Sequence, residues 1–382
     1  MVVSYEYLYF IAAFLISFGL SGWLVLRRDV FLRMANRRMD ASAVQAAHSV
    51  PTPRVGGVAV LLSVVLIGTL MTANDPDRIW MVAITLLPVF FAGLAEDLGF
   101  DINPRRRLVA AGISSLMCIL LFGAWITRTD LPIMDYFVEM TLVGMVFTVF
   151  AGAGICNAFN LIDGLNGLSS MVGITVAVAL SIIAQQGAQP HIAMWGYVMA
   201  CALVGFLAFN FPWGKIFMGD AGAYGIGHLL VWFAILLMHN VPQLSPWAML
   251  LVFFWPLADT VLAIVRRLRS GKPTHQPDRL HFHQLVMRTL EISMLGRSAR
   301  HIANPLSTVV MIPMFVAPPL VGVLLWDQTV AAALAFVVFS ILFAMTYSIG
   351  MVWARTSRTQ SGGRFLYDAV VQRINAVVHM VL

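Results

Sequence analysis

The chain has 382 residues, of which 60% are hydrophobic and only 11% are charged. Charged residues make up about a quarter of a typical soluble domain, so this sequence has too little polar surface to cover a water-facing globule. Its three cysteines lie far apart at Cys118, Cys156 and Cys201, a spacing that forms neither a disulfide framework nor a zinc motif.

Eleven apolar runs follow one another along the chain. Helices of about 17 to 26 residues cross a hydrocarbon core of ~30 Å, and lipid requires the backbone to satisfy its own hydrogen bonds. We therefore expect an all-α polytopic membrane protein of about eleven transmembrane helices, with no cleaved signal peptide because the first run is long enough to span. The expected spans are 4–26, 55–73, 79–95, 108–126, 136–156, 168–185, 191–209, 221–239, 246–265, 305–325 and 328–353.

The loops between these runs differ in charge. Of the 24 Lys and Arg residues, all except Arg78 and Arg128 lie in one alternate set of loops or in the tail. The positive-inside rule makes that set cytoplasmic and the N-terminus external. This placement accounts for the net charge of +6 without a nucleic-acid partner. We expect one transmembrane domain over residues 1–353 and a cytoplasmic tail over 354–382, which is either an amphipathic interfacial helix or a frayed terminus.

The first two polar segments lie beside expected spans. Arg54 stands between prolines and glycines in PTPRVGG, where it suits a phosphate oxygen or simply caps a loop. Glu96 and Asp97 end a span and are followed by Arg105 and Arg107. Adjacent acids near a low-dielectric surface repel, so at least one pKa should rise unless a cation lies nearby. This pattern suits a general base, a magnesium site or an ordinary charged loop, and the arginines suit anionic headgroups.

The third segment, NAFNLIDGLNGL, repeats polar residues every three positions. This spacing places Asn157, Asn160 and Asp163 on one helical face beside the membrane. Such groups are costly there unless they bind something, and Gly164 and Gly167 would let a ligand approach the backbone. The segment therefore predicts a binding site, with a structural network of asparagines as the alternative.

The last two segments add a possible metal ligand, an aromatic ring and two histidines. Asp220 precedes a span and could bind a metal, while Phe217 could stack on a planar base or make an ordinary core contact. Asp259 lies inside a span, where an acid is by default functional or paired. His281 and His283 have neither cysteine nor a third ligand nearby, so contacts to phosphate are a better interpretation than zinc.

All five segments fall in the cytoplasmic set. Carboxylates for Mg²⁺, basic groups for phosphate, an asparagine face and an aromatic ring together predict a site for an anionic diphosphate at a lipid boundary. A transporter or flippase is the main alternative, although transporters tend to place polar sites near the midplane and to contain repeats. Asp259 alone favours that alternative.

The motifs PTPRVGG, AEDLGFDINPRRRL, NAFNLIDGLNGL, NFPWGKIFMGDAGAYGIG and PDRLHFHQL resemble those of the polyprenyl-phosphate N-acetylhexosamine-1-phosphate transferases, over about 48–290. The resemblance implies that a UDP-N-acetyl sugar donates its sugar 1-phosphate to undecaprenyl phosphate, with release of UMP. This reaction would initiate a lipid-linked cell-envelope glycan at the bacterial inner membrane, with Mg²⁺ or alternatively Mn²⁺ as cofactor. A homodimer is also compatible with the family likeness.

The resemblance also implies residue roles. Glu96 and Asp97 would activate the lipid phosphate, Asp220 would hold the metal with Asp163, and Phe217 would stack on uracil. The family's first aspartate is Glu96 here and a common histidine is Gln284, so the identity of the base stays open and an inactive scaffold is a further alternative. The implied catalytic residues are Glu96, Asp97, Asp163 and Asp220. The implied substrate-binding residues are Arg54, Arg105, Arg107, Asn157, Asn160, Asn210, Phe217, Arg279, His281 and His283.

Overall fold

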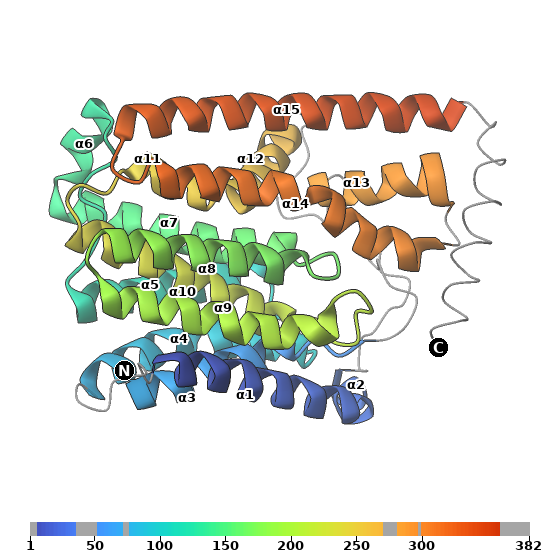
Figure 1. Ribbon diagram of the computed structural model, residues 1–382, viewed down its shortest axis with the longest axis horizontal. Helices are drawn as coiled ribbons and strands as arrows, with labels where there is room; N and C mark the ends of the chain where they lie inside the picture. Colours follow the sequence, from blue (N-terminus) through green and yellow to red (C-terminus); the bar gives the residue numbers. More distant parts are fainter. Residues whose placement is uncertain (1–5, 36–51, 72–75, 270–280, 297–298, 360–382) are drawn as a thin grey trace.

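The computed structural model describes residues 6–35, 52–71, 76–269, 281–296 and 299–359, and within them the secondary structure is helical without strands (Figure 1). This confirms the all-α prediction for the described part. The helices are α1 (Glu6–Leu26), α2 (Arg28–Ala35), α3 (Gly56–Met71), α4 (Pro76–Asp97), α5 (Pro104–Phe122), α6 (Pro132–Val138), α7 (Thr141–Ile162), α8 (Leu168–Gln186), α9 (Pro190–Asn210), α10 (Gly219–Asn240), α11 (Pro246–Val252), α12 (Phe254–Arg269), α13 (Phe282–Leu290), the π-helix η1 (Glu291–Leu295), α14 (Arg300–Leu324) and α15 (Thr329–Thr359).

Eight of the described helices are long and apolar enough to cross a membrane: α1, α4, α7, α8, α9, α10, α14 and α15. The chain is therefore a multi-pass membrane protein. The expected span at 246–265 is divided into α11 and α12, which meet at an angle of 81°. Pro256 lies in the first turn of α12 and cannot donate a backbone hydrogen bond, which favours a break there. The total of eleven spans stays a prediction, because α3 has only 16 residues and α5 begins with three arginines.

The most buried span is α10, which packs against α3, α4, α5, α7, α8 and α9. Its first turns are rich in glycine and alanine, which allow neighbouring backbones to approach closely. A Cβ on Gly57 of α3 would collide with the Cα of Gly222, and a Cβ on Gly93 of α4 would lie 2.5 Å from the Cα of Ala221. The N-terminal end of α10 is therefore enclosed by α3 and α4.

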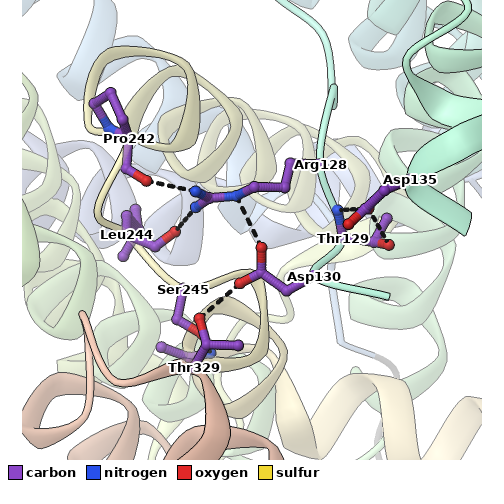
Figure 2. A network of polar contacts seen from close by, with 9 residues as sticks. Arg128, Thr129, Asp130, Asp135, Pro242, Leu244, Ser245 and Thr329 are labelled. Carbon is purple, nitrogen blue, oxygen red and sulfur yellow. Dashed lines mark hydrogen bonds and ion pairs between the residues drawn. The ribbon is translucent and has the colours of Figure 1, made fainter. Parts of the chain in front are cut away.

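The other end of α10 is joined to two neighbouring loops by a polar network centred on Arg128 (Figure 2). The Arg128 guanidinium donates hydrogen bonds of 2.5 Å to the carbonyl oxygens of Pro242 and Leu244 and lies 3.0 Å from Asp130 Oδ1. Asp130 Oδ2 accepts a hydrogen bond of 2.6 Å from the hydroxyl of Thr329, at the start of α15. We call these five residues the Arg128 network. The 22 residues of α10 separate it from the start of that helix by about 33 Å.

Candidate active site

The loop before α3 is paired with the loop before α10 through backbone hydrogen bonds. The N–H groups of Gly56 and Gly57 donate to the carbonyl oxygens of Phe217 and Met218, each over 2.8 Å. The Phe217 N–H donates in return to the carbonyl oxygen of Pro53 over 2.9 Å. Two segments that are far apart in the sequence, PTPRVGG and FMGDAG, therefore form one unit.

Asp97, at the end of α4, caps the N-terminus of α10. Its carboxylate accepts hydrogen bonds of 2.9 Å from the backbone N–H groups of Asp220 and Ala221. These are helix N-terminal donors that otherwise lack partners, and the positive end of the helix dipole favours the carboxylate. Gly219 has a φ of 76° and no room for a Cβ, which would collide with the carbonyl oxygen of Arg54 and lie 2.7 Å from Asp97 Oδ2. Only glycine fits where these three segments meet.

Asp220 points to α5, where it forms an ion pair with Arg107 that is mostly shielded from water. The Arg107 guanidinium also lies over the ring of Tyr224, 5.9 Å from its centroid. The Tyr224 hydroxyl donates a hydrogen bond of 3.1 Å to Asn157 Oδ1 on α7. Arg107 Nε is buried without a hydrogen-bond partner among the described residues, so this linked set keeps a donor available.

Asp163 directly follows the last residue of α7, and its carboxyl contacts the backbone of Gly219 at the start of α10. The Ser169 hydroxyl donates a hydrogen bond of 2.7 Å to its Oδ1. Removal from water raises the pKa of the Asp163 carboxyl, although the Ser169 hydrogen bond, the Arg54 charge, the Gly219 backbone and the His283 charge oppose that rise. These four groups together do not bring the pKa of Asp163 back to its ordinary value. A cation bound beside the carboxyl would therefore stabilise its ionised form.

Asp259 and the two histidines complete the cluster from α12 and α13. Asp259 Oδ1 accepts a hydrogen bond of 2.8 Å from the Phe282 N–H, and its Oδ2 lies 3.1 Å from Nδ1 of His283 and 3.3 Å from Nδ1 of His281. A Cβ on Gly164 would lie 2.7 Å from His283 Nε2, so the imidazole packs directly on the turn after Asp163. The glycines of NAFNLIDGLNGL thus make room for the imidazole of His283.

Asn210 joins two loops of the site through its amide. Its Oδ1 accepts a hydrogen bond of 2.6 Å from the Gly167 N–H, and its Nδ2 donates one of 2.8 Å to the carbonyl oxygen of Ile216. Asn210 is buried, and both polar atoms of its side chain contact backbone. The structure thus gives Asn210 a scaffolding contact, whereas substrate binding by this residue stays a prediction.

The remaining predicted site residues differ in burial and in contacts. Phe217 and Asn160 are half-buried, whereas the side chains of Arg54 and Arg105 are exposed. Glu96 is half-buried and its Oε2 accepts a hydrogen bond of 2.6 Å from the Ile102 N–H, so it holds the turn between α4 and α5. Arg279 and the tail 364–382 lie outside the described residues.

A cavity of about 280 Å³ opens beside these residues. Arg54, Glu96 and Asp97 form part of its polar wall, and Phe31 and Leu32 of α2 contribute apolar surface. The cavity therefore suits a ligand with both a charged and an apolar part.

The comparisons with known proteins agree with this arrangement. The model for "Glycosyl transferase family 4" matches residues 79–238. The chain is therefore similar to this family over somewhat less than half of its length. The matched region extends from α4 to α10 and contains Glu96, Asp97, Asp163 and Asp220.

The curated relatives of this chain share one printed activity. The undecaprenyl-phosphate alpha-N-acetylglucosaminyl 1-phosphate transferase of Yersinia pestis is 27% identical over 272 residues, which cover 70% of this chain and 73% of the relative. The namesake of Escherichia coli (strain K12) is 28% identical over 268 residues, covering 65% and 69%. A probable undecaprenyl-phosphate N-acetylglucosaminyl 1-phosphate transferase of Bacillus subtilis (strain 168) is 27% identical over 252 residues, covering 65% and 69%.

The acids of the candidate site have the donor chemistry that Mg²⁺ requires. Among the described residues, no group of three or more His, Cys, Asp or Glu side chains is arranged to hold a metal ion alone. Asp163 nevertheless accepts a contact from the Gly219 backbone, and Asp220 is the next residue in the chain, so two carboxyl groups lie near Gly219. Mg²⁺ is commonly bound through one or two carboxylates together with substrate phosphates, so this pair fits such an ion.

Sequence reasoning missed four features of this site. It assigned no element to α2, and it did not find the cap that Asp97 provides, the link through Tyr224 or the contact of both histidines with Asp259. The eight-residue α2 is too short to give a clear periodic signal. The other three are contacts between helices distant in sequence, which a single sequence does not encode in any local pattern.

Proposed function

We propose that this protein transfers N-acetylhexosamine 1-phosphate from a UDP-sugar to undecaprenyl phosphate with release of UMP, the first step of a lipid-linked cell-envelope glycan such as O-antigen, capsule or cell wall. The printed activity of the curated relatives supports this proposal. The observation that carries it is the meeting of Asp97, Asp163, Asp220 and Arg107, from four separate segments, at the N-terminus of α10.

The proposed topology has eleven spans, an external N-terminus and a site on the cytoplasmic face of the inner membrane. The charge asymmetry of the loops supports it, because Arg128 is near the opposite end of α10 from the site. This orientation would give the site access to a cytosolic UDP-sugar and to a lipid phosphate in the inner leaflet.

Asp163 and Asp220 would hold the Mg²⁺, which when bound supplies positive charge to a diphosphate. Arg107 would exchange part of its pairing with Asp220 for a phosphate oxygen, since a guanidinium binds carboxylate and phosphate with the same planar geometry. Phe217, half-buried in the loop that precedes α10, would offer a ring face to uracil.

The cavity beside Arg54 would receive the acceptor. Its polar wall places a guanidinium next to the carboxyls of Glu96 and Asp97, and Phe31 and Leu32 continue it with apolar surface. A phosphate is already mostly ionised at neutral pH, so a carboxylate there would orient the attacking oxygen more than deprotonate it. Asp97 is committed to the α10 cap, which favours Glu96 as the group that contacts the acceptor.

The transporter alternative depended mainly on Asp259 as an isolated acid within a span. Its carboxylate contacts His281 and His283, and His283 packs on the turn after Asp163. Asp259 therefore belongs to the same polar cluster as the other acids and does not define a second site along a transport path.

A direct assay tests the proposal. Purified protein is incubated with undecaprenyl phosphate, Mg²⁺ and a panel of UDP-N-acetyl sugars, and released UMP is measured. We expect UMP with at least one sugar, and none when undecaprenyl phosphate or Mg²⁺ is omitted. Sugar nucleotide that binds without release of UMP for any member of the panel would contradict the proposal and favour a scaffold.

A further inference from the structure

Asp259 is a fully buried acid with three nearby partners. It is 0% exposed, and among the described residues its carboxylate contacts the Phe282 N–H and the Nδ1 atoms of His281 and His283. A buried carboxylate is costly unless hydrogen bonds and opposite charge compensate it. The compensating groups here are a backbone N–H and two imidazoles, of which the imidazoles can carry positive charge.

The central residue of the His-Phe-His turn fixes the direction of both imidazoles. Phe282 is 2% exposed and packs edge-on against Trp255, with 5.3 Å between ring centroids, and in a tilted arrangement against Phe343, with 4.9 Å between centroids. With Phe282 anchored between α12 and α15, the rings of His281 and His283 stack at 5.6 Å and direct Nδ1 to the same carboxylate oxygen. The turn therefore presents two histidines in one fixed orientation.

The opposite edge of His283 faces the acid cluster. Its Nδ1 is taken by Asp259, while its Nε2 is buried and has no hydrogen-bond partner in the part of the chain that the structure describes. That Nε2 lies against Gly164, next to Asp163, and the His283 charge lowers the pKa of Asp163. A buried polar atom left unpaired at a binding site is suited to a ligand atom.

We propose that Asp259 is a positioning residue, which accepts the Nδ1–H of His283 and stabilises its imidazolium so that the Nε2–H donates to an anionic phosphate oxygen bound beside Asp163. This inference rests on the proposed function, since the phosphate would be that of the sugar nucleotide. Asp259 itself does not contact the substrate. The fixed Nδ1 contact leaves only Nε2 for a ligand, and charge on the ring strengthens its hydrogen bond to an anion.

The first test is independent of turnover. Histidine labelled with ¹⁵N is incorporated into the full-length protein, and the His283 signals are assigned by comparison with His283→Gln. We expect a protonated Nδ1 in the wild type. In Asp259→Asn the amide oxygen would accept the hydrogen bond from the Phe282 N–H, and the amide NH₂ would face Nδ1 of His283. Nδ1 would then have to accept a hydrogen bond, so we expect the proton on Nε2 and a neutral ring. An unprotonated Nδ1 in the wild type would overturn the proposal even if no substrate is ever found.

The second test is a double-mutant cycle on UMP release. We expect Asp259→Asn to lower kcat about 10- to 100-fold with a much smaller change in KM, a loss typical of groups that orient a ligand-binding histidine. Asp259→Asn combined with His283→Gln should be no slower than His283→Gln alone, and Asp259→Glu should recover part of the activity. Losses that multiply would show that Asp259 does not act through His283. Asp130→Asn, in the Arg128 network, is the matched control and should leave kcat unchanged.

Discussion

At the C-terminal end of α10, the guanidinium of Arg128 has two carbonyl partners and a carboxylate, and that carboxylate in turn accepts a hydrogen bond from Thr329 (Figure 2). At the N-terminal end, Asp163 has an elevated pKa, and Arg107 Nε and His283 Nε2 are buried without hydrogen-bond partners among the described residues. Both ends join loops that are distant in the sequence. In the described part of the chain, no side-chain atom of the Arg128 network is buried and unpaired, unlike these two nitrogens at the N-terminal end.

This difference separates a network that stabilises from one that binds. A satisfied polar network contributes to folding, whereas buried acids and unpaired donors cost free energy until a ligand compensates them. Proteins accept such a cost where function requires it. Substitutions at the Arg128 network should therefore lower stability and spare turnover. Substitutions of the acids near Gly219 should instead lower turnover and spare stability.

The largest effect is expected from Asp220→Asn, which keeps the shape of the side chain and removes its charge. The variant leaves Arg107 without its carboxylate partner and removes one of the two proposed metal ligands. We expect UMP release to fall about 1,000-fold, as when a preorganised electrostatic contact to the reacting group is lost. Thermal unfolding should change little. A variant with wild-type turnover would contradict the assignment of Asp220 to the metal.

Gly57→Ala tests whether the site depends on close packing of α3 against α10. A Cβ at Gly57 would collide with the Cα of Gly222 and lie 2.8 Å from the carbonyl oxygen of Met218, so the two backbones would have to separate. We expect a loss of about 1–3 kcal/mol in the free energy of unfolding, together with reduced UMP release.

The matched control for Gly57→Ala is Gly154→Ala. Gly154 lies in α7, and a Cβ there would meet nothing within 4 Å. Because alanine favours helix over glycine, that variant should be neutral or up to about 1 kcal/mol more stable. Equal effects of the two substitutions would show that close approach of α3 and α10 does not matter.

The sequence predicted an all-helical protein and predicted that five polar segments lie on one face of the membrane. Each of these predictions used a local signal: span length, the charge of a loop, or residue types near a span end. The break at Phe253 was missed because the residues on both sides of it are apolar, and hydropathy does not report an angle. The helices α2, α6 and α13 were missed because they are 7 to 9 residues long.

Asp97, Asp163 and Asp220 lie together at the N-terminus of α10, but the sequence could not separate binding groups from supporting ones. Asp97, predicted as catalytic, and Asn210, predicted to bind substrate, also hold the backbone of α10 and of two loops, and their predicted roles stay predictions. Tyr224 and Asp259 contact site residues across long sequence separations. A carboxylate that caps a helix and one that faces a ligand have the same local sequence signature, and only the fold distinguishes them.

Arg128→Gln tests the Arg128 network at the C-terminal end of α10. The shorter amide cannot reach both the Pro242 and Leu244 carbonyls and also compensate Asp130, so at least one partner loses its contact. The side chain is 39% exposed and water replaces part of the loss, which limits the expected cost to about 1–2 kcal/mol in the free energy of unfolding. The free energy of unfolding of Arg128→Lys should lie between those of the wild type and Arg128→Gln. A change in kcat beyond that of the thermal stability would contradict a purely structural role.

Asp163→Asn is expected to change stability with the opposite sign from Arg128→Gln. Burial raises the pKa of Asp163 above its ordinary value, so ionisation is harder in the folded protein than in the unfolded chain. At neutral pH and without Mg²⁺ the folded state therefore carries a penalty, which an isosteric neutral amide removes while it still accepts the hydrogen bond from Ser169. We expect a Tm higher by a few degrees and little UMP release.

The pH dependence of that Tm gain tests its cause. A raised folded pKa means that the folded protein holds its proton more tightly, so the wild type regains stability as the pH falls through that pKa towards the ordinary value of 3.8. The advantage of Asp163→Asn, measured in EDTA, should therefore shrink as the pH is lowered. Asp135→Asn, whose carboxylate accepts two hydrogen bonds from Thr129 at the opposite end, should give no gain at any pH. A gain for both, or one independent of pH, would remove the distinction between the two ends of α10.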